Sequence, residues 1–325
     1  MKGKYRIKIY DRFVSYDFEI KRNITIIRGD SGTGKTSLIK LLLEHQDHPE
    51  NVAFIGDCET LVITGETSWE MFKQDAKSEN PKYSKRIVFI DEGYRFVDKC
   101  LFYEYDNYFV LISRKDTNKK LSQLLYSIEE IYEIVSSGKY NTTSPVYNEL
   151  VPMYKSSPND NPDLLILEDE ASGFQFFESV FPNCESAKGN SNVVTKLEDV
   201  SKDKNILAIV DGAAYGPYSS DLFTYISKYK NINVYFPESF EWIILKSGVI
   251  EDIPNIEEKL NCTYDYADSL EYNSWEDYYF KLLEYETLND RRKQYNKHKL
   301  KEFYTSKGIK ELILDVLPFR LINSN

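Results

Sequence analysis

A glycine-rich octapeptide near the N-terminus has the residue types and spacing of a phosphate-binding loop. Its sequence, GDSGTGKT, covers residues 29–36 and fits the pattern G-x-x-x-x-G-K-[ST]. Glycines let consecutive backbone N–H groups face phosphate oxygens, the lysine reaches the β- and γ-phosphates, and the threonine hydroxyl binds Mg²⁺. The segment predicts a nucleoside triphosphate site that comprises Gly29, Asp30, Ser31, Gly32, Thr33, Gly34, Lys35, Thr36 and Ser37.

Two acidic residues follow an apolar run about 55 residues further along the chain. Residues 87–90 read IVFI, and Asp91 and Glu92 come directly after them. The run predicts a buried strand, at whose end Asp91 would bind Mg²⁺ and Glu92 would polarise the attacking water. A strand that ends in two solvated acids is the alternative. The upstream glycine-rich loop favours the metal site.

The loop and the Asp-Glu pair together resemble the division of P-loop ATPases that includes the ABC, AAA+ and RecA-like proteins. The resemblance implies Mg²⁺-dependent hydrolysis, with ATP favoured over GTP, and it argues against a small-molecule kinase, in which water must be excluded. Such ATPases often place a polar residue that senses the γ-phosphate at the end of the next strand, where this chain has Ser113 followed by Arg114. No LSGGQ-like signature is present, so ABC-type dimerisation is not implied.

A second series of acids follows apolar runs in the C-terminal half of the chain. Glu168 comes after the run at 164–167, and Asp211 comes after the run at 206–210. This series resembles a TOPRIM domain, the fold shared by topoisomerases, primases and OLD-family nucleases. Glu168 falls on the position of that family's invariant glutamate, and Asp211 on its first aspartate.

The TOPRIM resemblance implies a metal site but also departs from it. Glu168, Asp211 and a later acid, Glu241 or Glu238, would be the ligands. Ala213 stands where the family has a second aspartate, so such a site would lose one ligand. Two alternatives stay open: a metal-dependent nuclease, and a degenerate domain that serves only as a binding scaffold.

Strand and helix patterns alternate along the chain and predict an α/β fold. A hairpin over residues 4–28 leads into the phosphate-binding loop, and a stretch rich in turn formers at 136–163 marks a boundary. The expected organisation is a P-loop NTPase domain with a parallel sheet at 1–150, a TOPRIM-like α/β domain at 151–265, and a helical, basic segment at 266–325. The expected elements of the first domain are the strands 51–56, 87–90 and 108–113 and the helices 36–44 and 69–77.

The C-terminal segment has a local excess of positive charge. Residues 291–310 contain eight basic residues and only one acidic residue, with three aromatic residues among them. They are Arg291, Arg292, Lys293, Lys297, Lys299, Lys301, Lys307 and Lys310. This composition is typical of a DNA or RNA contact, and equally of the solvated face of a helix.

Bulk properties exclude some classes of protein. The net charge of −11 disfavours coating of nucleic acid by the whole surface. No apolar run approaches the roughly 20 residues of a membrane span, so a cytoplasmic protein with no membrane partner is expected. The four cysteines form no C-x-x-C pair and indicate neither a zinc site nor a disulfide framework.

Two functions fit these patterns. The first is an ATPase whose nucleotide state controls a TOPRIM-like domain that acts on or binds nucleic acid, as the resemblance to ATPase-TOPRIM proteins of phage defence and genome maintenance implies. The second is a nucleotide-dependent switch or assembly protein whose inactive second domain binds a partner protein. The pattern does not choose between nucleic acid, a partner protein and a second copy of the chain.

Overall fold

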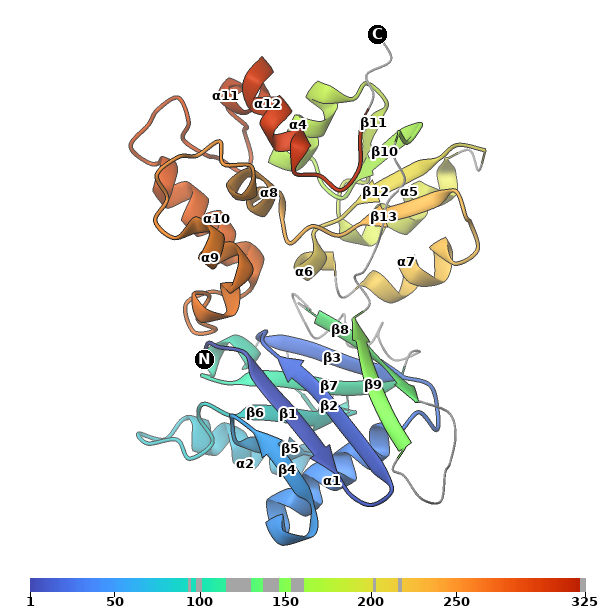
Figure 1. The fold of residues 1–325 in the computed structure, drawn as a ribbon, viewed down its shortest axis with the longest axis vertical. Helices are drawn as coiled ribbons and strands as arrows, with labels where there is room; N and C mark the ends of the chain where they lie inside the picture. Colours follow the sequence, from blue (N-terminus) through green and yellow to red (C-terminus); the bar gives the residue numbers. More distant parts are fainter. Residues whose placement is uncertain are drawn as a thin grey trace. The chain divides into compact units, whose positions relative to one another are not determined.

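The computed structural model describes residues 1–92, 95–97, 101–114, 130–136, 146–152, 161–200, 203–215 and 218–321. The chain divides into two compact units (Figure 1). Unit 1 comprises Met1–Met153 and Tyr264–Ser274, and unit 2 comprises Tyr154–Thr263 and Trp275–Asn325. The residues expected to form a separate segment at 266–325 are therefore shared between the two units.

Unit 1 is built on a nine-stranded mixed sheet with the order β4-β1-β2-β9-β8-β3-β7-β6-β5. Five neighbouring strands, from β8 to β5 in this order, run parallel, whereas β1 pairs antiparallel with β2 and β4. The strands are β1 Tyr5–Tyr10, β2 Val14–Ile20, β3 Ile24–Gly29, β4 Ala53–Gly56, β5 Thr60–Ile63, β6 Ile87–Asp91, β7 Tyr108–Arg114, β8 Glu130–Ser136 and β9 Val146–Pro152.

The predicted parallel sheet is confirmed for its central strands and wrong at two places. The strand expected near residues 51–56 is β4, which pairs antiparallel with β1, while the unpredicted β5 pairs parallel with β6. The unpredicted β9 lies inside the stretch 136–163 that was expected to be a boundary, and it pairs with β8 and β2. The rest of that stretch, 137–145 and 153–160, lies outside the described residues.

The core of unit 1 explains the position of the glycine-rich loop. All six residues of β3 are buried, so this strand is central. The helix α1 (Lys35–Asp47) follows it and buries Leu38, Ile39, Leu41 and Leu42. Burial of these apolar side chains fixes both ends of the loop between β3 and α1. The other helical elements of unit 1 are η1 Pro49–Asn51, α2 Glu66–Ala76 and η3 Leu101–Glu104.

Unit 2 contains a four-stranded, fully parallel sheet with the order β11-β10-β12-β13. Its strands are β10 Leu164–Leu167, β11 Cys184–Ser186, β12 Ile206–Ile209 and β13 Ile232–Tyr235. The strands predicted from the runs at 164–167 and 206–210 are confirmed. Because the carboxyl ends of parallel strands meet at one edge, Glu168 and Asp211 come to the same edge of this sheet.

Helices complete unit 2 (Figure 1). They are α4 Ser172–Val180, η5 Asn190–Asn192, α5 Val193–Asp199, α6 Gly212–Tyr215, α7 Ser219–Ile226, α8 Phe240–Lys246, α9 Ile256–Asn261, α10 Trp275–Thr287, α11 Glu302–Thr305 and α12 Lys307–Asp315. The basic segment is helical only in part, since residues 288–301 between α10 and α11 form turns and loop. In the described part of the chain, no helix has both the length and the apolar character needed to cross a membrane.

Candidate functional site

The loop between β3 and α1 has a backbone that requires glycine at several positions. Gly32 and Gly34 have φ angles of 81° and 104°, a region that other L-amino acids rarely adopt. A Cβ atom on Gly29 would lie only 2.5 Å from the Thr33 hydroxyl oxygen. The glycines that the sequence pattern singled out are thus needed for the shape of the loop.

Lys35 closes this loop from inside. Its ammonium group donates hydrogen bonds to the carbonyl oxygens of Gly29, at 2.5 Å, and Asp30, at 2.6 Å. The buried Tyr16 on β2 donates its hydroxyl proton to the carbonyl oxygen of Gly34 at 2.7 Å. Tyr16 is a supporting residue that the sequence pattern did not indicate, because it comes from a neighbouring strand.

The N-terminus of α1 faces solvent beside the loop. Asp30, Ser31, Gly32 and Thr36 are exposed, while Ser37 is half-buried. The first turn of this 13-residue helix contains no acidic residue, so the positive end of the helix dipole is not compensated there. This arrangement favours an anion at the loop.

The strand β7 brings the predicted acids to the same edge as the loop. It pairs with β3 on one side, with Gly29 opposite Arg114, and with β6 on the other, with Asp91 opposite Ile112. Ser113 is buried between them, and its hydroxyl lies 3.3 Å from the carbonyl oxygen of Arg114. The polar end of β7 therefore lies between the glycine-rich loop and the Asp-Glu pair.

The Asp91 carboxyl group is half-buried at the end of β6. Burial, and then the charge of Glu92, raise its pKa, although the positive charges of Arg95 and Lys35 act in the opposite direction. A nearby cation would stabilise the charged form of this half-buried carboxyl group. The Asp91 carboxylate and the Thr36 hydroxyl are hard oxygen donors of the kind that Mg²⁺ prefers.

Glu92 lies in a strained backbone conformation and is held by two arginines. Its φ angle is 49°, which is uncommon outside glycine. One carboxylate oxygen lies 2.6 Å from the guanidinium of Arg95, and the other lies 3.9 Å from that of Arg114. The sequence analysis missed Arg95, for which the spacing of three residues from Glu92 was the available signal.

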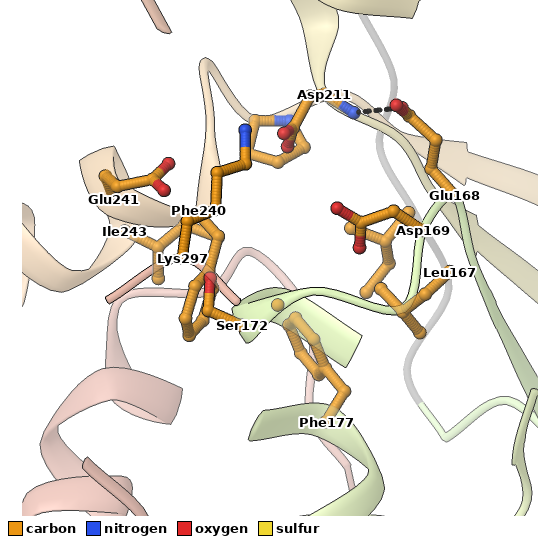
Figure 2. A pocket seen from close by; sticks show the side chains of 13 residues that line it. Leu167, Glu168, Asp169, Ser172, Phe177, Asp211, Phe240, Glu241, Ile243 and Lys297 are labelled. Carbon is orange, nitrogen blue, oxygen red and sulfur yellow. Dashed lines mark hydrogen bonds between the residues drawn. The ribbon is translucent and has the colours of Figure 1, made fainter. Parts of the chain in front are cut away.

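The acids of unit 2 line one small cavity of about 30 Å³, which has room for a single water molecule (Figure 2). The backbone N–H of Asp211 donates to a carboxylate oxygen of Glu168 at 3.0 Å. Burial raises the pKa of Glu168 to about 8 and raises that of Asp211 well above its ordinary value. Asp169 and Glu241 also line this cavity, whereas Glu238 does not.

Glu241 enters the cavity from the first turn of α8. The Ser239 side chain caps this helix by accepting a hydrogen bond from the N–H of Trp242 at 3.2 Å. Tyr295 donates its hydroxyl proton to one oxygen of Glu241 at 2.6 Å, and the Ser172 hydroxyl lies 2.5 Å from that of Tyr295. The other oxygen of Glu241 is buried and accepts no hydrogen bond.

Lys297 also lines this cavity. Its ammonium group lies 2.5 Å from a carboxylate oxygen of Glu276 on α10. Among the described residues, no group of three or more His, Cys, Asp or Glu side chains could hold a metal ion. The structure thus brings Glu168, Asp211 and Glu241 to one cavity without arranging them as a metal site.

The predicted basic segment, which includes Lys297, is only partly exposed. Lys297 points into unit 2, and the aromatic residues Tyr295 and Tyr304 are buried, so these three do not form a surface for bases or phosphates. Arg291, Arg292, Lys299, Lys301 and Lys307 are exposed. Five of the eight basic residues therefore stay accessible to a nucleic acid, and the predicted interface remains a prediction.

Comparisons with known proteins do not place the chain in a family. No protein-family model matches it, and no significant relative was found among the curated proteins.

Proposed function

We propose that unit 1 is a Mg²⁺-dependent nucleoside triphosphatase that uses ATP. The observation that carries this proposal is the position of β7, which brings the ends of β3 and β6 together at one edge of the sheet. The glycine-rich loop, the Asp91-Glu92 pair and Ser113 then lie together at this edge, where the nucleotide would bind. These are the parts that phosphoryl transfer needs: a phosphate cradle, a cation site and a group that orients water.

Lys35 has a defined role in this proposal. Its ammonium group is hydrogen-bonded to two carbonyl oxygens, and phosphate oxygens offer the same type of acceptor with a full negative charge. On binding, Lys35 exchanges these carbonyls for the β- and γ-phosphates. The backbone N–H groups of the loop and the N-terminus of α1 stabilise the same charge.

The acids divide the remaining tasks. Asp91 and Thr36 would hold Mg²⁺, and the ion would supply positive charge to neutralise the phosphate oxygens. Glu92 accepts a hydrogen bond from the attacking water and orients it toward the γ-phosphorus. Arg95 and Arg114 hold the Glu92 carboxylate in place, and Ser113 senses the γ-phosphate from the neighbouring strand.

We further propose that the nucleotide state of unit 1 controls unit 2, a TOPRIM-like domain that binds nucleic acid. The chain passes between the two units three times, at 153–154, 263–264 and 274–275. The segment Tyr264–Ser274 is anchored in unit 1, where the Asn23 side chain donates to the carbonyl oxygen of Tyr272 at 2.9 Å. A change in unit 1 therefore has a covalent route to unit 2. In the competing proposal, unit 2 binds a partner protein.

Nucleotide binding by the full chain tests the central part of this proposal. Lys35→Ala should weaken ATP binding at least about tenfold, because a charge-assisted hydrogen bond contributes roughly 1.5–3 kcal/mol. The control is Lys40→Ala, which removes an exposed lysine from the same helix. Equal affinities of Lys35→Ala and the wild type, measured by calorimetry with ATP and Mg²⁺, would contradict the assignment.

A further inference from the structure

The backbone around Lys297 is clamped to the first turns of α4. The N–H of Ser172 donates to the carbonyl oxygen of Lys297 at 2.8 Å. Gln175 adds two bonds, donating from its side chain to the carbonyl of His298 and accepting from the N–H of Leu300, both at 2.9 Å. Three hydrogen bonds thus fix this loop, so the direction of the Lys297 side chain is set by the fold.

Carboxyl groups surround the end of that side chain. Glu276 forms the ion pair, and Figure 2 shows Glu241 and Asp211 on either side of Lys297. Burial lowers the pKa of the Lys297 ammonium group, but Glu276, Glu241 and Asp211 outweigh burial and raise it. The ammonium group is therefore held in its charged form at the centre of these acids.

A divalent cation and an ammonium group would compete for the same oxygens. Lys297 supplies a positive charge that is covalently attached and fixed by its backbone. One carboxylate oxygen of Glu241, which lines the same cavity, is buried without a hydrogen-bond partner. A metal ion would have to enter against the repulsion of the lysine. With Lys297 in the cavity, the described residues form no group that could hold a metal ion.

We propose that Lys297 is the resident cation of the unit 2 cavity and takes the place of the metal ion that the TOPRIM resemblance implies. Unit 2 is then a metal-independent binding module rather than a metal-dependent nuclease. Ala213 agrees with this assignment, because the second aspartate that would hold a metal is absent from the sequence. The inference holds whether or not unit 1 hydrolyses ATP.

Binding of Mn²⁺ to the full chain in nucleotide-free buffer tests the proposal, with electron paramagnetic resonance to count bound ions. Wild type and Glu168→Gln should bind Mn²⁺ equally weakly. Lys297→Met removes the charge but keeps a side chain of similar length. This variant should gain one Mn²⁺ site, with an affinity at least tenfold higher than that of any site in the wild type. That site should disappear in Lys297→Met combined with Glu168→Gln. Lys299→Met, which alters an exposed lysine of the same loop, is the matched control and should behave as the wild type.

Two results would overturn the proposal. The first is a Mn²⁺ site in the wild type that Glu168→Gln or Glu241→Gln weakens tenfold or more. The second is a folded Lys297→Met protein, with the circular dichroism spectrum of the wild type, that gains no Mn²⁺ site. If Lys297→Met does not fold, the comparison of wild type with Glu168→Gln and Glu241→Gln decides alone, since equal and weak binding supports the proposal.

Discussion

The ammonium group of Lys297 lies 2.5 Å from a carboxylate oxygen of Glu276, and the two residues come from a loop and a helix that are 21 positions apart in the chain. The pair joins α10 to the loop that is clamped on α4. The Lys297 side chain is 33% exposed, and the Glu276 side chain is 17% exposed. An ion pair of this partly buried kind contributes to stability chiefly because each charge is costly without the other.

Lys297→Met should therefore destabilise unit 2 by about 2 kcal/mol, between the values for surface and buried ion pairs. Glu276→Gln should cost less, because the ammonium group keeps Glu241 and Asp211 as neighbours. Urea unfolding followed by circular dichroism measures both. Lys299→Met should stay within about 0.5 kcal/mol of the wild type. Equal stabilities of Lys297→Met and Lys299→Met would show that the ion pair contributes nothing.

The raised pKa of Glu168 predicts how stability depends on pH. Its value of about 8 in the folded chain exceeds the ordinary value of 4.5, so the folded state binds more protons between these two pH values. Stability should then fall as pH rises from about 5 to 8, since deprotonation of the buried acid costs free energy only in the folded state. Glu168→Gln should flatten this decline in urea midpoints. An identical slope in wild type and variant would contradict the burial of a titrating Glu168.

The glycine-rich loop makes a prediction about backbone shape. Gly34 has a φ angle of 104°, so Gly34→Ala should strain the loop by about 1–2 kcal/mol and weaken ATP binding about tenfold. Gly65→Ala is the control, because Gly65 is extended and a Cβ there has open space. Calorimetric titration with ATP and Mg²⁺ measures the effect. Unchanged affinity in Gly34→Ala would mean that the loop does not bind phosphate in this conformation.

The exposed basic residues give a prediction about nucleic acid. Replacing Arg291, Arg292 and Lys299 with glutamine should weaken binding of single-stranded DNA or RNA and reduce the salt dependence of its affinity, because fewer counterions are released. Fluorescence anisotropy at several salt concentrations measures the slope. A wild-type protein that binds neither polymer, or a variant with the wild-type slope, would favour a partner protein for unit 2.

The strand, loop and helix around the glycine-rich sequence could be predicted because their pattern is local. A strand, five loop residues and a helix carry the whole pattern, so the positions of Lys35 and Thr36 could be predicted without long-range information. The strand ends at Asp91, Glu168 and Asp211 could be predicted for the same reason, since buried parallel strands read as apolar runs. The partners of the strands could not be predicted in this way, so the antiparallel pairing of β4 with β1 was missed.

The role of Lys297 could not be predicted from composition. In the sequence it is one of eight basic residues in a polar stretch, and an exposed lysine has the same neighbours. Its direction follows from the hydrogen bonds between its loop and α4, and its partners come from three other elements. The basic run was therefore interpreted as a surface, although its central lysine lines the unit 2 cavity and Tyr295 and Tyr304 are buried.

The rate of ATP hydrolysis in Glu92→Gln tests the central proposal most directly. The substitution keeps the size of the side chain and removes the carboxylate that orients water, so hydrolysis should slow by about 100-fold or more while ATP affinity stays within about threefold of the wild type. Glu104→Gln, an exposed glutamate of unit 1, should retain the wild-type rate. A Glu92→Gln protein that hydrolyses ATP at the wild-type rate, or a wild type with no Mg²⁺-dependent hydrolysis at all, would contradict the assignment of unit 1 as an ATPase.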